Sequence, residues 1–155
     1  GFKINPDTDK LEVLPELDIE KSQFRYILLN KPVGYVCSKS DLDGRNIFEL
    51  LPRVDGLTYA GRLDKDSSGL IILSNDGKFV YSVAGSEFER EKEYIVRVNK
   101  PITNNYLYYQ SNGLIKLDGK QVKPAKVKSI NEDTYQIIIK EGMNRQIRRM
   151  AENQG

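Results

Sequence analysis

The stretch that most constrains this chain runs from Tyr59 to Gly77 and reads YAGRLDKDSSGLIILSNDG. Its apolar run, Leu70 to Leu73, is typical of a buried strand, and the polar, glycine-bearing segment before it is typical of a loop that feeds such a strand. Loops on a rigid scaffold often present reactive groups, so we expect the chemistry here, at Asp64. Arg62 favours an ionised Asp64 that can act as a nucleophile or a base, and an inert surface ion pair is the alternative.

Cysteine and histidine usage narrows the possible chemistry. The 155 residues contain no histidine and a single cysteine, Cys37, which we expect to be a small buried hydrophobic residue. An internal disulfide, a Ser-His-Asp triad, a Cys-His pair and a histidine metal site are therefore excluded for this chain. Carboxylates, tyrosines, lysines and arginines remain as candidate catalytic groups.

The length fits one soluble globular domain with a substantial core. No apolar run approaches the roughly 20 residues that cross a bilayer, and the first residues do not resemble a signal peptide, so we expect a cytoplasmic protein. Residues 1–23 are acidic and contain Pro6 and Pro15, which predicts a linker or a peripheral hairpin before a domain over residues 24–155. A monomer is the default expectation.

Charge is distributed unevenly along the chain. The net charge is only +2, but Lys116 to Arg149 holds nine basic and four acidic residues. A basic second half attracts a phosphate backbone, which makes RNA a candidate partner. Many of these lysines can also simply solvate strand faces.

Periodicity and turn residues predict the other elements. Phe24 to Asn30 and Tyr35 to Ser38 are expected to pair as a hairpin. We also expect short helices before Pro52 and over residues 77–86, a strand over residues 91–98, a helix over residues 101–110 capped by Thr103, and an antiparallel meander over residues 114–117, 122–130 and 135–140.

The segment EGMNRQIRRM, Glu141 to Met150, predicts a helix that Asn144 caps. Arg145, Arg148 and Arg149 then lie on its first turns, with Arg145 beside both others. The start of a helix favours negative partners, so three arginines there indicate a carboxylate or a phosphate nearby. A solvated basic helix is the alternative.

Three ordered motifs carry a family resemblance: GRLDKDSSGLIILSNDG (Gly61 to Gly77), EKEYIVRV (Glu91 to Val98) and EGMNRQIRRM (Glu141 to Met150). A fourth, weaker match is KPVGYVCS (Lys31 to Ser38). Together they resemble the bacterial rRNA pseudouridine synthases of the RsuA/RluB/RluE/RluF family. The combination is most similar to the RluF-like large-subunit branch.

This resemblance implies an α+β domain with a mixed, mostly antiparallel sheet, flanking helices and an active-site cleft across the sheet. It implies that a uridine in rRNA, in the large subunit, is isomerised to pseudouridine without a metal or a cofactor. In this family a small RNA-binding domain of the S4 type often precedes the catalytic domain, and a further strand segment follows the last helix. We therefore expect the catalytic domain here to be truncated at its C-terminus and to lack the S4 domain.

The resemblance also implies roles for single residues. Asp64 would be the catalytic nucleophile or base, and Arg148 would pair with it. Tyr94 would stack on the target uracil, although on propensity alone it is a half-buried aromatic residue of a sheet. Arg62 would hold the gap that a flipped-out nucleotide leaves.

Three more basic residues are candidate RNA contacts. The resemblance implies phosphate contacts for Arg145 and Arg149, and which of the three arginines pairs with Asp64 stays open. Lys31 is either a phosphate contact or a solvated lysine of a turn.

Two rival functions remain. A non-catalytic RNA-binding module would keep the fold, and a carboxylate glycosidase would need a second acid beside Asp64, for which Asp66 is available. The products distinguish them: an RNA of unchanged mass, a free base or sugar, or no product at all.

Overall fold

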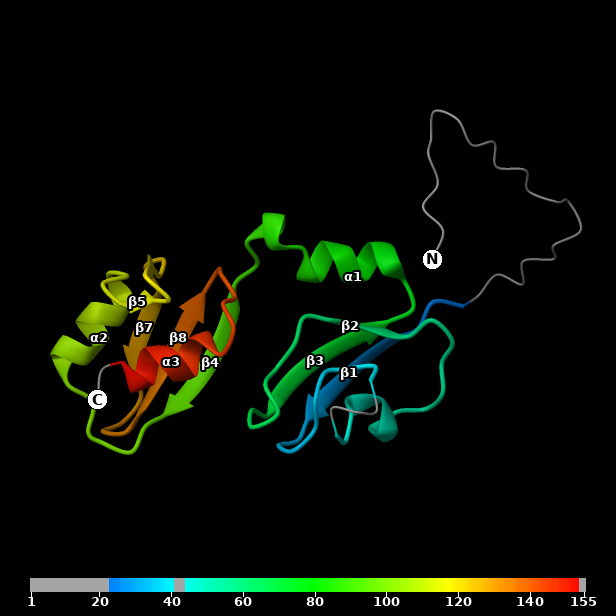
Figure 1. The fold of residues 1–155 in the computed structure, drawn as a ribbon, viewed down its shortest axis with the longest axis horizontal. Coiled ribbons are helices and arrows are strands. Elements are labelled where there is room, and N and C mark those ends of the chain that lie inside the picture. Colours follow the sequence, from blue (N-terminus) through cyan, green and yellow to red (C-terminus); the bar gives the residue numbers. More distant parts are fainter. Residues whose placement is uncertain (1–22, 41–43, 154–155) are drawn as a thin grey trace, which may run out of the picture.

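The computed structural model describes residues 23–40 and 44–153, so the segment expected as a linker, 1–23, lies outside the described residues except for its last one. Within these ranges the chain forms two three-stranded sheets, one two-stranded sheet and three α-helices (Figure 1). The α+β class is confirmed, and all paired strands are antiparallel. The two larger sheets lie side by side, so the cleft described below runs between two sheets instead of across one.

The first sheet contains, in spatial order, β1 (Tyr26–Lys31), β3 (Gly69–Ser74) and β2 (Thr58–Ala60). Side chains alternate along β3, because Ile71 and Leu73 are buried whereas Leu70 is 64% exposed. The apolar run is therefore a half-buried strand and not a fully buried one. Its inner side joins a small core that includes Ile47 and Cys37, and Cys37 is buried as expected.

The expected hairpin between residues 24–30 and 35–38 is wrong. β1 instead pairs with β3 along its whole length. Gly34 has a positive φ of 94° and turns the chain, after which Val36 forms only a single parallel bridge, to Asn46. A six-residue strand offers β1 a full set of backbone partners, which the short segment after Gly34 does not.

The second sheet contains β4 (Lys92–Arg97), β8 (Thr134–Ile139) and β7 (Lys126–Ser129), and a separate pair contains β5 (Lys116–Leu117) and β6 (Lys120–Gln121). The strands expected over 91–98 and 135–140 are confirmed within two residues. The meander is interrupted, because the segment expected as a strand over 122–130 pairs only from Lys126 onward. Pro124 lies just before that point and lacks the N–H that a strand ladder requires.

The helices are η2 (Ile47–Leu50), α1 (Gly77–Ala84), η3 (Ser86–Phe88), α2 (Asn104–Ser111) and α3 (Gln146–Glu152). Polar side chains cap three of them at the start: Asn46 caps η2, Asp76 caps α1, and Thr103 caps α2 as expected. None of the helices in residues 23–40 and 44–153 combines the length and the apolar character that crossing a membrane requires.

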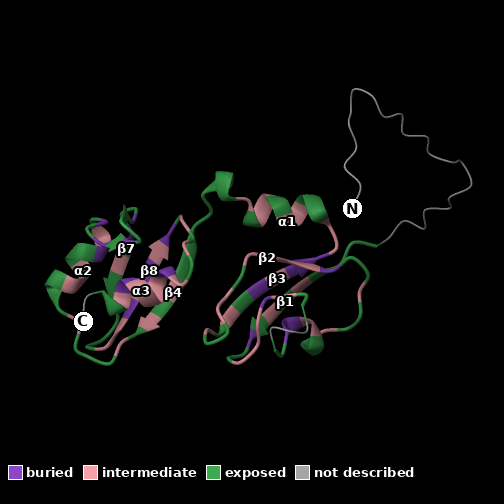
Figure 2. Cartoon of the chain, viewed as in Figure 1, coloured by how far each residue is buried: buried purple, intermediate pink, exposed green. Residues whose placement is uncertain are grey.

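Each large sheet has its own core, centred on its middle strand (Figure 2). On β8 the buried side chains are Tyr135, Ile137 and Ile139, which pack with Met150 of α3. The chain passes from the first half to the second through α1 and η3 (Figure 1). The fold therefore presents two halves, each with its own core, whose facing loops and strands line a common site.

Candidate active site

The loop before β3 carries Asp64 in a tight turn. The backbone carbonyl oxygen of Asp64 accepts a hydrogen bond from the N–H of Ser67 (3.0 Å), and the N–H of Leu63 donates to Sγ of Cys37 (3.4 Å). The loop ends at Gly69, whose φ of 138° lies in the region that favours glycine. The backbone is thus fixed on both sides of Asp64, while the Asp64 side chain remains 30% exposed.

Lys31, the last residue of β1, lies fully buried beneath this loop. Its Nζ donates to the backbone carbonyl oxygens of Ser67 (2.6 Å), Pro32 (2.9 Å) and Lys65 (3.4 Å). Burial lowers the pKa of the Lys31 ammonium group, and neighbouring acidic groups oppose that shift. Lys31 is therefore not the solvated lysine of a turn that was one of the two expectations. The other expectation was a contact with a phosphate, and in the structure its ammonium group bonds to backbone carbonyl oxygens.

The start of α3 is held by Gln146, which is buried. Its Oε1 accepts a hydrogen bond from the N–H of Met143 (2.9 Å), and its Nε2 donates to the carboxylate of Glu141. Arg145 occupies the N-cap position in a left-handed conformation with φ of 48°, so the expected Asn144 cap is wrong. The side chain of Gln146 bonds to residues just before the helix, and these bonds hold the segment that leads into α3.

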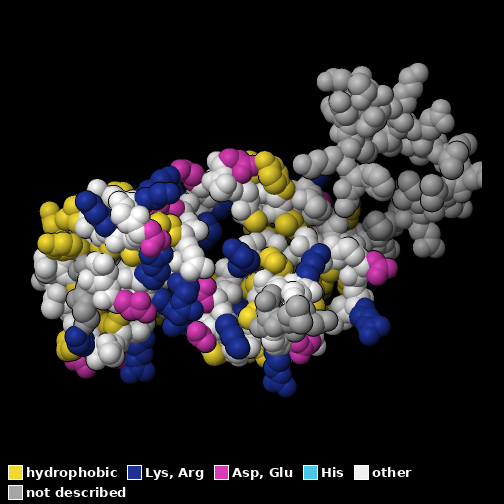
Figure 3. All heavy atoms as spheres, in the orientation of Figure 1, with side chains coloured by type: hydrophobic (Ala, Val, Ile, Leu, Met, Phe, Trp, Pro, Cys, Tyr) yellow, Lys and Arg dark blue, Asp and Glu magenta, His cyan; other side chains and the backbone are white. Residues whose placement is uncertain are grey.

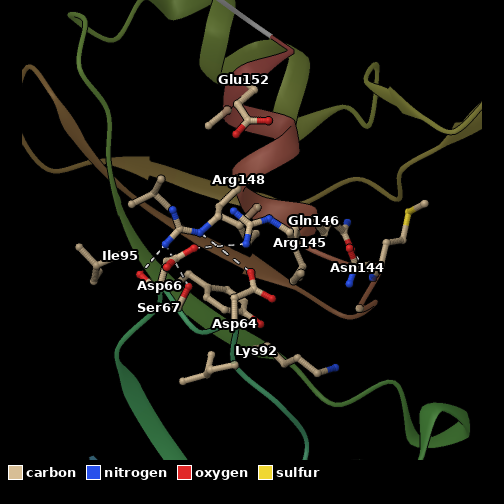
Figure 4. Close-up of a pocket in the computed structure, with 18 of the residues that line it drawn as sticks. Asp64, Asp66, Ser67, Lys92, Ile95, Asn144, Arg145, Gln146, Arg148 and Glu152 are labelled. Atoms are coloured by element: carbon tan, nitrogen blue, oxygen red, sulfur yellow. Dashed lines mark hydrogen bonds and ion pairs between the residues drawn. The ribbon is translucent and has the colours of Figure 1, made fainter. Parts of the chain in front are cut away.

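Arg148 reaches from α3 to the Asp64 loop (Figure 4). Its Nη2 donates to the backbone carbonyl oxygen of Asp66 (2.6 Å) and to Oγ of Ser67 (3.3 Å). Its Nε lies 4.0 Å from Oδ2 of Asp64. This Nε is buried and makes no hydrogen bond, so Arg148 presents an unused donor beside the carboxylate of Asp64.

The three arginines of this segment have different partners. Nη1 of Arg145 lies 3.5 Å from Oδ2 of Asp66, whereas Nη2 of Arg149 donates to Oδ1 of Asp118 at 2.6 Å. Arg145 and Arg148 line the cleft, and neither Arg149 nor Asp118 does. Two of the three predicted arginines therefore meet the Asp64 loop, and the third is held by the turn between β5 and β6.

Tyr94 reaches the same cleft from β4, where it lies opposite Ile137 of β8. Burial raises the pKa of its phenol, and the negative charge of Asp64 raises it further. The hydroxyl group therefore stays protonated at neutral pH, and it lies within the electrostatic field of Asp64.

The cleft between the two halves has a volume of about 1670 Å³. It is lined by nine cationic side chains, Arg62, Lys65, Lys92, Arg97, Lys100, Lys123, Lys140, Arg145 and Arg148, and by five acidic ones, Asp64, Asp66, Glu89, Glu141 and Glu152. Lys and Arg side chains lie on both sides of this hollow (Figure 3). The cleft is thus more positive than the whole chain, whose net charge is +2. The described residues contain no group of three or more His, Cys, Asp or Glu side chains able to hold a metal ion.

Sequence reasoning misses the residues that position this site. Gln146 and Glu141 fix the start of α3, and Ser67 accepts from Arg148. Asp66, considered only as a second acid, contacts two arginines through different atoms. The one signal that could have identified Gln146 is its position four residues before Met150, which puts both residues on the same face of α3, and both are buried.

Comparison with known proteins places this geometry in a family. Residues 25–153 match the family model described as RNA pseudouridylate synthase. The chain is 41% identical over 129 residues to the Dual-specificity RNA pseudouridine synthase RluF of Escherichia coli strain K12, covering 83% of this chain and 44% of that protein. It is 35% identical over 135 residues to the Ribosomal small subunit pseudouridine synthase A of Haemophilus influenzae, covering 85% of this chain and 57% of that protein.

A further relative is the Ribosomal large subunit pseudouridine synthase B of Xanthomonas campestris, which is 34% identical over 143 residues, covering 84% of this chain and 29% of that protein. A solved structure described as a pseudouridylate synthase superposes with a TM-score of 0.76 at 33% identity, covering 83% of this chain and 56% of that one. The chain thus spans about half the length of RluF, its first relative above. With its matched motifs, fold and cleft, the chain belongs to the RNA pseudouridylate synthase family, in the bacterial group of RsuA, RluB and RluF.

Proposed function

We propose that the protein containing this chain isomerises a specific uridine in rRNA, within the large subunit, to pseudouridine, with Asp64 as the catalytic nucleophile or base. One observation carries the proposal: Asp64, Arg148 and Tyr94 come from three distant segments and line one cleft. Asp64 is partly exposed, so a nucleotide can reach its carboxylate. The relatives named as ribosomal small subunit and ribosomal large subunit pseudouridine synthases support the same substrate class.

The reaction exchanges one bond between base and ribose for another. A uridine within folded RNA must first leave its stack to expose the glycosidic bond, which costs a few kcal/mol. Asp64 then initiates cleavage of the bond between C1′ and N1, by attack at C1′, by attack at C6, or by removing a ribose proton. The base turns, C5 bonds to C1′, C5 loses its proton, and N1 gains one. Atoms and electrons balance within the nucleotide, so the proposal requires neither a metal nor a cofactor.

The neighbours of Asp64 have distinct tasks in this scheme. Arg148 is bonded to the loop backbone and turns an unused Nε toward Asp64, so it holds the loop and offers a charged donor beside the carboxylate. Tyr94 offers its ring to the face of the uracil and a neutral hydroxyl to a polar atom of the base. Arg62 is exposed on the same cleft, where it can occupy the gap in the RNA stack.

The charge of the cleft supports an RNA substrate. Nine cations against five acids attract a polyanion, and phosphate contacts offset the cost of extracting the base. Arg145 lies at the cleft wall within reach of such a phosphate. We also propose a monomer, because residues of one chain line the whole cleft, and a cytoplasmic location, because the proposed substrate is rRNA.

The test is direct detection of product. The protein, with any natural flanking sequence, is incubated with unmodified rRNA, and pseudouridine is located by carbodiimide treatment and primer extension. Asp64→Asn should abolish the product while keeping RNA binding. Asp55→Asn is the matched control, because Asp55 is an exposed acid that does not line the cleft, and it should remain active.

The outcomes separate the rival functions. Pseudouridine from the wild type and from Asp55→Asn, but not from Asp64→Asn, supports both the reaction and the role of Asp64. Release of free uracil would instead indicate a glycosidase that uses Asp64 and Asp66. RNA binding without any product from the full protein would leave a non-catalytic RNA-binding module.

A further inference from the structure

Asp66 is contacted by two arginines in two different ways. Arg148 donates to the backbone carbonyl oxygen of Asp66 at 2.6 Å, whereas Arg145 approaches its side-chain carboxylate at 3.5 Å (Figure 4). The first contact does not depend on the side chain at position 66. The second depends on it entirely, so the two contacts can change independently.

The contact between Arg145 and the Asp66 carboxylate is weak enough for another anion to replace the carboxylate. It is long, it uses one nitrogen and one oxygen, and the two side chains are 40% and 58% exposed. Exposed ion pairs of this kind are weak because water and salt compete for both partners. By contrast, Arg149 holds Asp118 at 2.6 Å, away from the cleft.

Asp66 also occupies the position of an anion in a cleft where cationic side chains outnumber acidic ones. A phosphate group binds a guanidinium group through two parallel hydrogen bonds and is the stronger partner for Arg145. A carboxylate that stays beside the displaced arginine repels that phosphate. Binding therefore requires a phosphate placed well enough to overcome the competition.

We propose that Asp66 is an internal competitor of RNA for Arg145 and thereby a specificity-determining residue. This inference rests on the proposed function, since it assumes that RNA enters the cleft. Asp66 neutralises Arg145 in the free protein. A phosphate beside the correctly placed target nucleotide then displaces the carboxylate, while the backbone bond from Arg148 keeps the Asp64 loop in position during the exchange.

The experiment compares the RNA affinity of charge-matched variants. Asp66→Asn removes the competing charge and preserves size and the backbone acceptor. Asp118→Asn removes one negative charge from the pair that Asp118 forms with Arg149, which lies outside the cleft. Arg145→Gln and the double variant Asp66→Asn/Arg145→Gln complete a double-mutant cycle with the wild type and Asp66→Asn. Kd is measured for an unmodified rRNA transcript and for an unrelated single-stranded RNA at two salt concentrations.

The expected result is tighter binding by Asp66→Asn, by about two- to fivefold, which is the range for releasing one exposed ion pair. The gain should be larger for the unrelated RNA, so that discrimination falls. Asp118→Asn should stay close to the wild type. Arg145→Gln should weaken binding and reduce the salt dependence by about one counterion, and it should remove the gain of Asp66→Asn.

Three outcomes would overturn the inference: unchanged or weaker binding by Asp66→Asn, an equal gain by Asp118→Asn, or a gain that persists without Arg145. Asp66→Ala, which cannot retain a hydrogen bond to Arg145, should give at least the gain of Asp66→Asn. If the wild type binds no RNA, the proposed function fails together with this inference. If the wild type forms pseudouridine and Asp66→Asn shows no gain, only this inference fails.

Discussion

The buried ammonium group of Lys31, at the end of β1, donates a hydrogen bond of 2.6 Å to the carbonyl oxygen of Ser67, in the loop that carries Asp64. Ser67 in turn donates its backbone N–H to the carbonyl oxygen of Asp64. Lys31 at the end of β1 therefore fixes the loop backbone on one side, and Arg148 of α3 bonds to it from the opposite side of the cleft. Asp64 is positioned between these two supports.

Removing the hydrogen bonds of Lys31 should affect both stability and catalysis. In Lys31→Met the carbonyl oxygens of Ser67 and Pro32 lose their buried partner, which should lower the free energy of unfolding by about 1–3 kcal/mol. The loop then loosens, and kcat for pseudouridine formation should fall. Urea unfolding and single-turnover kinetics measure the two effects. Lys128→Met, at an exposed lysine of β7, is the control and should change neither the stability nor kcat. Wild-type stability in Lys31→Met would show that the bonds of Lys31 do not stabilise the loop.

Arg148 should be intolerant of a conservative replacement. Arg148→Lys keeps the charge but loses the fork that donates to the Asp66 backbone and turns Nε toward Asp64. A preorganised donor of this kind is typically worth about 10²–10³ in rate, so kcat should fall by about that factor. RNA affinity should change only a few-fold, because the positive charge remains.

The neighbouring residue supplies the control for that experiment. Arg149→Lys alters an arginine whose partner, Asp118, lies outside the cleft, so it should keep kcat within about twofold of the wild type. Equal losses of kcat in Arg148→Lys and Arg149→Lys would mean that the loss comes from a general change in the helix and not from the guanidinium group of Arg148.

Local patterns in the sequence predict local structure well. The alternation over residues 91–98 identifies β4, and Thr103 marks the start of α2. The motifs also place Asp64, Tyr94 and Arg148 together, because family resemblance carries information about distant contacts. What the patterns miss is non-local: β1 has no local signal that its partner is β3 and not the segment after Gly34.

The same limit applies to side chains in the site. A lysine next to a proline and near a glycine is typical of a solvated turn, and nothing nearby in the sequence shows that Lys31 also bonds to two carbonyl groups of the Asp64 loop. Likewise, Asn144 is the better capping residue by preference. In the structure Arg145 takes that position, and the buried side chain of Gln146 bonds to Met143 and Glu141, an arrangement that residue preferences alone do not predict.

Two variants of Tyr94 can separate the contribution of its aromatic ring from that of its hydroxyl group. Tyr94→Phe keeps the ring, so RNA affinity should stay within about twofold, whereas Tyr94→Leu should weaken binding by the loss of about 1–3 kcal/mol of stacking. The phenol is neutral and lies in the field of Asp64, so its removal in Tyr94→Phe should lower kcat by about 10² or more.

The pH profile checks the protonation state of Tyr94. Burial and Asp64 raise the pKa of the phenol above its ordinary value of 10.0. A rate that depends on the protonated hydroxyl should therefore not decline through Tyr94 ionisation below about pH 10. A decline in kcat near pH 8 that disappears in Tyr94→Phe would contradict this assignment.

Tyr135 should be the main source of alkaline sensitivity in the second core. Its buried hydroxyl bonds to Tyr106 (3.1 Å) and Gln110 (3.1 Å), and burial, followed by the bond to Tyr106, raises its pKa far above 10.0. Above pH 10 the unfolded chain loses a proton that the folded chain keeps. The contribution of Tyr135 to the free energy of unfolding should therefore be constant below pH 10 and fall above it, by at most about 1.4 kcal/mol for each pH unit.

Tyr135→Phe should separate the hydroxyl network from the packing of the ring. It leaves the Nε2 of Gln110 without its partner, so the free energy of unfolding at pH 7 should decrease by about 1–3 kcal/mol. It also removes the titrating group, so the decline above pH 10 should become shallower. Urea unfolding between pH 7 and 11 measures both effects, with Tyr108→Phe as the control because Tyr108 is 57% exposed on α2. A Tyr135→Phe variant with wild-type stability and an unchanged alkaline slope would show that the network contributes nothing, and the second core would then depend on apolar packing alone.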